Sequence, residues 1–148
     1  MAYKMMLSRP YDGMSSIWNV SAHVGDAPSC PNNSADVDLV KVLLGEWIRI
    51  VQPSIHTSCR EVFRVNGQMD INAAYWIRVM NTNHTQSIGF VDAGIISPAQ
   101  AANYGNDTWS IVRLNRVLHH RAIDVWQNLP NHPQGNGALR SALSRTSP

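Results

Sequence analysis

The segment Ser34-Ala-Asp-Val-Asp-Leu-Val-Lys-Val-Leu-Leu-Gly-Glu-Trp-Ile-Arg-Ile-Val51 carries the strongest structural signal in the chain. Its apolar residues recur every three or four positions, which is the period of an amphipathic α-helix. Ser34 is the predicted N-cap, and Asp36 and Asp38 fall in the first turn, where the helix dipole favours anions. Pro53 ends the helix. The apolar stripe consists of Val37, Val40, Leu43, Leu44, Trp47, Ile48 and Val51.

A second helix is predicted directly after a turn. Asn66-Gly67 is a turn dipeptide, because both residues tolerate a positive φ. Asp70 can cap a helix that runs from Ile71 to about Thr82. We expect its inward-facing residues to be Ala73, Ile77 and Met80.

The last long helix is expected to begin at a cap on Asp107 or Thr108 and to end at Pro130. Before it, Ser97-Pro-Ala-Gln100 combines a capping box with proline at the first helical position, which predicts a short helix ending near Gly105. The buried stripe of the long helix is predicted to be Ile111, Leu114, Leu118, Ala122, Val125 and Leu129.

Extended structure is predicted at two places. Ile17 to Val24 alternates between apolar and polar residues, as a half-buried strand does, with Asn19 on the polar side. Residues 25–33 read as a loop, because they are rich in Pro, Gly and Asn. Glu61 to Val65 is a short strand candidate that leads into the turn dipeptide.

Together these elements predict a mainly α fold: a small bundle of three principal helices packed at steep angles, with an N-terminal strand and a short hairpin. The chain has 148 residues, of which 44% are hydrophobic, and this suits one domain. We expect residues 1–33 to form an N-terminal strand and loop and residues 34–129 a helical core. Residues 130–148 have the composition of a linker and are expected to form a C-terminal tail. Helix faces packed on one another are expected to leave no cleft for chemistry.

Composition excludes several classes of protein. No run of about 18 apolar residues is present, so we expect no membrane insertion. The N-terminus lacks the pattern of a secretory signal, which predicts synthesis in the cytoplasm. The net charge of +2 comes without a clustered basic patch, so nucleic acid is not a predicted partner. Cys30 and Cys59 are too few for a disulfide scaffold, and whether they pair stays open.

The small number of charges points to association. Charged residues make up 15% of the chain, against about 25% in ordinary domains, and five residues are Trp. A surface of this kind is typical of a protein that is partly covered by neighbours. The predicted partners are copies of the chain or other subunits of an assembly.

Motifs of catalysis are missing from the sequence. It contains no glycine-rich phosphate loop, no His-Glu-x-x-His, no Gly-x-Ser-x-Gly and no Cys-x-x-Cys. We therefore predict no enzyme, no catalytic residue, no cofactor and no metal. Three alternative sites are compatible with the sequence: a zinc pair at His120 and Asp124, a thiol–imidazole pair at His56 and Cys59, and a partner-binding basic face. That face consists of Arg113, Arg116, His120 and Arg121.

Two segments resemble the peptidoglycan-binding-like domain, a small three-helix module of bacterial and phage cell-wall enzymes. Residues 36–45, Asp-Val-Asp-Leu-Val-Lys-Val-Leu-Leu-Gly, are similar to its opening helix, Val-x-x-Leu-Gln-x-x-Leu. Residues 65–81, Val-Asn-Gly-Gln-Met-Asp-Ile-Asn-Ala-Ala-Tyr-Trp-Ile-Arg-Val-Met-Asn, align without gaps with its Val-Asp-Gly-x-Phe-Gly motif and the helix after it. The resemblance extends over about residues 36–112.

The resemblance implies a non-catalytic binding module in a phage particle, a secretion machine or a cell-envelope assembly, with peptidoglycan as a partner. The alternative is a self-assembling structural subunit of a virion or similar particle that binds no wall. Asn, Asp and exposed aromatic side chains complement the amides, hydroxyls and apolar sugar faces of such a polymer. The predicted ligand-binding residues are Asn66, Gly67, Asp70, Asn72, Tyr75 and Trp76.

Overall fold

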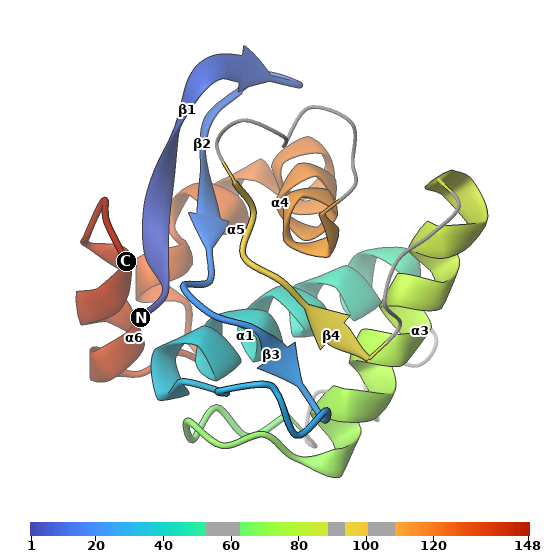
Figure 1. The fold of residues 1–148 in the computed structure, drawn as a ribbon. Helices are drawn as coiled ribbons and strands as arrows, with labels where there is room; N and C mark the ends of the chain where they lie inside the picture. Colours follow the sequence, from blue (N-terminus) through green and yellow to red (C-terminus); the bar gives the residue numbers. More distant parts are fainter. Residues whose placement is uncertain (53–62, 89–93, 101–108) are drawn as a thin grey trace.

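The computed structural model describes residues 1–52, 63–88, 94–100 and 109–148. For residues 84–88 it describes the backbone only. Within these residues the chain forms five α-helices, one 3₁₀ helix and two small antiparallel sheets. Figure 1 shows α1 crossing the middle of the molecule, with the N-terminal hairpin and the C-terminal helices beside it. None of the described helices combines the length and the apolar character that crossing a bilayer requires.

The N-terminus forms a hairpin that the sequence pattern did not predict in full. Strand β1 (Tyr3–Tyr11) pairs antiparallel with β2 (Met14–Asn19). The turn between them is Asp12-Gly13, and both residues have a positive φ, 50° and 81°. Two consecutive left-handed residues match the right-handed twist of paired strands, which is why Asp-Gly is a common hairpin turn.

The two helices with the clearest period are present. Helix α1 (Ser34–Val51) ends before Pro53 as predicted and begins one residue before the predicted start, because its N-cap is Asn33, which makes no side-chain capping bond. Helix α3 (Ile71–Ile88) begins where predicted and runs longer than predicted. The three residues predicted to face inward on α3 are fully buried, which confirms its orientation: Ala73, Ile77 and Met80.

The predicted long final helix is divided in the structure. Helix α4 (Ser110–Arg121) ends at Ala122, which has φ −150° and ψ 56°, and a short α5 (Ile123–Gln127) follows. The 3₁₀ helix η2 (Leu129–Asn131) then contains Pro130. No glycine or proline marks the break, so the interruption comes from tertiary contacts and not from local propensity.

Residues 130–148 contain a packed helix where the sequence suggested a tail. In α6 (Gly137–Leu143), Leu139, Ala142 and Leu143 are buried in the main hydrophobic cluster. Asn136 caps the helix by accepting a hydrogen bond from the backbone N of Leu139 at 2.8 Å. The chain's own core therefore holds this segment.

The prediction of a mainly α bundle with three principal helices is wrong. The first 19 residues form a two-stranded hairpin that packs on α4, and β3 (Val24–Gly25) pairs with β4 (Ile95–Ile96) in a second sheet. The final helix is broken, and α6 is additional. The fold is a mixture of helices and small sheets around α1.

Three local predictions also fail. Asn19, placed on the polar side of a strand, is fully buried, and that strand ends there. Residues 97–100 are not helical and continue from β4, while the remainder of that predicted helix, 101–105, lies outside the described residues. Residues 63–65 form no strand, and Glu61 and Val62 are outside the described part.

A buried asparagine joins the hairpin to α4. Asn115 accepts a hydrogen bond from the backbone N of Trp18 at 2.8 Å and donates to the Trp18 carbonyl at 2.8 Å. Its Oδ1 also accepts from Nε1 of Trp126 at 3.0 Å, and the Trp126 carbonyl accepts from Nε1 of Trp18 at 2.9 Å. These bonds hold the segment after the break at Ala122 against β2, which explains why the helix turns there.

Candidate functional site

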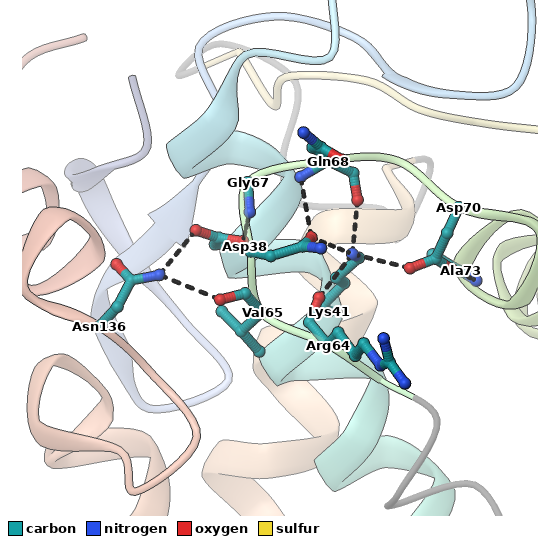
Figure 2. A network of polar contacts seen from close by, with 10 residues as sticks. Asp38, Lys41, Arg64, Val65, Gly67, Gln68, Asp70, Ala73 and Asn136 are labelled. Carbon is teal, nitrogen blue, oxygen red and sulfur yellow. Dashed lines mark hydrogen bonds and ion pairs between the residues drawn. The ribbon is translucent and has the colours of Figure 1, made fainter.

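The predicted turn lies against a polar side of α1 (Figure 2). The Lys41 side chain is fully buried, and its Nζ donates to the carbonyl of Arg64 at 2.7 Å and to the carbonyl of Gln68. Nζ also lies 3.3 Å from Oδ1 of Asn66 and 2.9 Å from Oδ2 of Asp70. A buried ammonium group is stable only when its N–H groups donate to acceptors and its charge is paired, as they are here.

A second buried group of α1 holds the same turn. Asp38 accepts a hydrogen bond from the backbone N of Gly67 at 2.7 Å and another from Nδ2 of Asn136 at 3.0 Å. Nδ2 of Asn136 also donates to the carbonyl of Val65 at 3.2 Å. The turn is therefore fixed to α1 and to the residue that caps α6. Asp38, which was predicted to interact with the dipole of α1, also holds this turn in place.

Gly67 has the backbone conformation that the turn dipeptide predicted. Its φ is +78°, and a Cβ added there would lie 3.1 Å from Cβ of Ser34. The left-handed conformation and the close approach to α1 both favour glycine over any residue with a side chain. This predicted site residue is therefore part of the support of the turn.

Asp70 caps α3, as predicted, and also pairs with Lys41. Its Oδ1 accepts a hydrogen bond from the backbone N of Ala73 at 2.8 Å. Burial raises the pKa of this carboxyl, but the hydrogen bonds from Ala73 and Lys41 outweigh it, so the pKa lies below its ordinary value. Asp70 is consequently ionised at neutral pH and holds the start of the helix.

The outer face of α3 exposes two large apolar side chains. Ile71 is 85% exposed and Tyr75 is 59% exposed, and they are one helical turn apart. Asn72, the next residue along the helix from Ile71, is half-buried, whereas Trp76 is buried and contacts Tyr75 edge-to-face with ring centroids 5.3 Å apart. Of the six predicted residues, Asn66, Asn72 and Tyr75 are accessible at this face. Ile71 was missed, although its position outside the buried stripe of α3 marks it.

The expectation that the helices leave no cleft is wrong. A pocket of about 390 Å³ lies between α1 and the segment 124–134. Its inner end holds two buried side chains, Glu46 and His132, with Nε2 of His132 2.8 Å from Oε1 of Glu46. Arg49, half-exposed at the mouth, donates to the other oxygen of Glu46. Sequence reasoning missed this pair because the two residues are 86 positions apart.

Both ring nitrogens of His132 are engaged. The backbone N of Gln134 donates to Nδ1 at 3.1 Å, so Nδ1 is an acceptor and Nε2 carries the proton that is donated to Glu46. This tautomer follows from the hydrogen-bond network. A general base needs a nitrogen lone pair that faces a substrate, and in this arrangement the only lone pair is occupied.

Comparison of the chain with protein-family models, with curated proteins and with solved structures finds no match. The resemblance to peptidoglycan-binding-like domains therefore depends on the quoted sequence segments.

Glu46 is expected to make stability depend on pH. Burial raises its pKa, but the hydrogen bonds from His132 and Arg49 outweigh burial and hold the pKa below the ordinary value of 4.5. A lowered carboxyl pKa gives stability that is present above pH 4.5 and is lost as the pH falls through the pKa of the folded protein. Urea unfolding between pH 7 and pH 3 measures this loss.

Glu46→Gln is the matched variant, because it keeps the shape and removes the titration. We expect it to be less stable than the parent at pH 7, with a difference that narrows as the pH falls. Asp70 and Asp26 also have lowered pKa values and remain in both proteins, so part of the acid sensitivity persists. Parallel stability curves for the two proteins across this pH range would contradict the assignment.

The structure bears on the alternative sites that the sequence suggested. His120 and Asp124 lie on separate helices, because the chain breaks at Ala122. No group of three metal-ligating side chains occurs in the described residues. His56 and Cys59 lie outside the described part of the chain, so the thiol pair and the Cys30–Cys59 disulfide stay open. The basic face lines a shallow groove with Asp12 and Val51: Arg113, Arg116, His120 and Arg121.

Proposed function

We propose that this chain is a non-catalytic binding module that recognises peptidoglycan in a phage particle, a secretion machine or a cell-envelope assembly. The contact surface, called the recognition face here, consists of Asn66, Gln68, Ile71, Asn72 and Tyr75. The observation that carries the proposal is the exposure of Ile71 and Tyr75 beside a turn that buried groups hold in place.

The chemistry of the recognition face suits a polymer of sugars and peptides. Tyr75 offers a ring face to the C–H side of a sugar and a hydroxyl to its polar edge. Asn66 and Gln68 are exposed on the adjoining turn. The Oδ1 of Asn66 already accepts from Lys41 and from the backbone N of Gln68, so Asn66 supplies its Nδ2 as a donor, while the Gln68 amide supplies a donor and an acceptor. An isoleucine that is 85% exposed gains free energy when a ligand covers it, because apolar area then leaves water.

The support beneath the recognition face favours binding. Lys41 and Asp38 fix the backbone of the turn before any ligand arrives, through the contacts of Figure 2. A surface that is already ordered loses little conformational entropy on association, so more of the contact energy appears as affinity.

The non-catalytic part of the proposal has support in the pocket. Glu46 is held between His132 and Arg49, and both nitrogens of His132 are occupied. These groups are arranged to stabilise each other and the local fold, and a proton transfer through His132 requires breaking one of these bonds.

Co-sedimentation with purified peptidoglycan sacculi tests the proposal. We expect the protein to pellet with sacculi and Tyr75→Ala to weaken retention about tenfold, the loss of one good aromatic contact. Ile123→Ala is the matched control, because Ile123 is 43% exposed on α5, away from the recognition face. Since Tyr75 is exposed, its variant should unfold at the same urea concentration as the parent.

Two results contradict the proposal. One is that the parent protein stays in the supernatant. The other is that light scattering shows an oligomer that Tyr75→Ala dissociates while no protein pellets. The second result supports the alternative, a self-assembling structural subunit whose copies meet through this face.

A further inference from the structure

We propose that the pocket between α1 and residues 124–134 is a second binding site and that it takes a neutral mono- or disaccharide. This inference is independent of the recognition face, because the two sites share no residue. Its volume of about 390 Å³ falls within the range of about 300–1,000 Å³ that small-molecule sites occupy.

Polar side chains of the pocket lining have hydrogen-bonding groups that no described residue contacts. The carboxylate of Asp124 and the side-chain amides of Asn131 and Gln134 have no partner among the described residues. Asn128 donates its Nδ2 to the carbonyl of Asp124 at 3.0 Å, and no residue of the described part of the chain donates to its Oδ1. These four residues, called the mouth residues here, are Asp124, Asn128, Asn131 and Gln134.

One carboxylate and several amides are the groups that recognise hydroxyls. A carboxylate accepts hydrogen bonds from two neighbouring hydroxyls at once, and a planar amide donates to one oxygen while it accepts from another. A sugar ring presents hydroxyls of this kind around its edge. The mouth residues therefore supply complementary groups for such an edge.

The floor of the pocket suits the faces of the ring. The apolar lining consists of the buried Ile48 and Phe63, the half-buried Val125 and the exposed Pro133. The C–H groups of a pyranose form an apolar face, and burying that face against an aromatic and aliphatic floor is favourable. A combination of an apolar floor with a few polar groups is typical of a pocket for a small ligand.

The charges around the pocket argue against an anion. Arg49 neutralises Glu46 through an ion pair and a hydrogen bond, and His132 donates to Glu46 as a neutral ring. Within the described ranges, the lining charge without an ion-pair partner is that of Asp124, which repels a phosphate or a sulfate. A ligand with hydroxyl donors and no negative charge is the chemistry that remains.

Saturation-transfer NMR on the full chain tests this inference with a panel of glucose, N-acetylglucosamine, cellobiose and chitobiose. We expect transfer to at least one of them and a dissociation constant that Asp124→Ala or Asn131→Ala raises at least about tenfold, the effect of losing one hydrogen bond to a sugar hydroxyl. Gln127→Ala is the control, because Gln127 is exposed on α5 and does not line the pocket. Unchanged urea unfolding shows that the variants remain folded.

Three outcomes overturn the inference: no sugar of the panel shows transfer, the mouth variants bind as the parent does, or ethylammonium binds with dependence on Asp124 while no sugar does. The last outcome makes the pocket a cation site. Because Tyr75→Ala leaves the pocket intact, failure at the recognition face and failure at the pocket are measured separately.

Discussion

Replacing Lys41 with methionine is expected to lower the free energy of unfolding by about 3 kcal/mol, because two backbone carbonyls lose a donor at about 1–3 kcal/mol each and Asp70, which is 34% exposed, loses a cation at a smaller cost. Methionine fills nearly the same volume but donates no hydrogen bond. The carbonyls of Arg64 and Gln68 then lose their donor, and Asp70 loses its cation. Urea unfolding monitored by tryptophan fluorescence measures the change.

Lys4 provides the matched control, because it is the only other lysine in the chain. Its Nζ lies over the ring of Trp18 at 5.4 Å from the centroid, a contact worth about 1 kcal/mol at a partly exposed site. Lys4→Met should therefore cost much less than Lys41→Met. Equal losses in the two variants would show that the network of Figure 2 does not stabilise the turn.

Replacing Asn115 with leucine is expected to cost about 3 kcal/mol or more, because a buried polar group left without its partner costs about 1–3 kcal/mol. The variant leaves the backbone N–H and carbonyl of Trp18 without partners and also frees Nε1 of Trp126. Leucine adds no cavity, so the loss reports the hydrogen bonds. Thermal or urea unfolding gives the difference.

Gln127→Leu is the control for this substitution, since it exchanges an exposed amide for leucine on the neighbouring helix. We expect it to change stability by less than about 0.5 kcal/mol. Backbone hydrogen exchange adds a local measure: the amide of Trp18 should exchange faster in Asn115→Leu and not in Gln127→Leu. Continued protection of that amide would argue that Asn115 does not close the hairpin.

Periodicity was sufficient where a helix buries one clear stripe. Helix α1 ends before Pro53 as predicted and begins one residue before the predicted start, with Asn33 and not Ser34 as its N-cap, and α3 begins at Ile71 after its Asp70 cap. These features are local, since they depend on residues three or four apart and on one capping side chain. The positive φ of Gly67 could be predicted for the same reason, because the preference of an Asn-Gly turn for this conformation depends on the two residues alone.

Some elements that were not predicted depend on contacts between residues far apart in the sequence. The N-terminal hairpin, in contrast, is marked by a local turn dipeptide that the prediction did not include. This dipeptide is Asp12-Gly13, which forms the turn between β1 and β2. The break at Ala122 has no local sign, since it follows from the bonds of Trp126 to Trp18 and Asn115. The three buried residues of α6 have helical spacing, but the Pro and Gly content around them suggested a linker.

The candidate sites also differ in how far they could be predicted from local sequence. The turn at Asn66 could be found from its residues, whereas the inward role of Lys41 could not, because its partners lie far along the chain, from Arg64 to Asp70. The pocket is the extreme case. Its two walls come from segments far apart in the sequence, and nothing near Glu46 indicates that His132, 86 positions later, will meet it.

The side-chain bonds of Asn115 have a consequence for how copies of this protein can associate. The outward backbone groups of Trp18 are already taken, so a foreign strand finds no donor or acceptor at that point of β2. On the opposite edge, the backbone N of Lys4 donates to the carbonyl of Arg145 at 2.8 Å, and Pro10 has no N–H. The hairpin is thus protected at these points against edge-to-edge aggregation, and association is directed to side-chain surfaces.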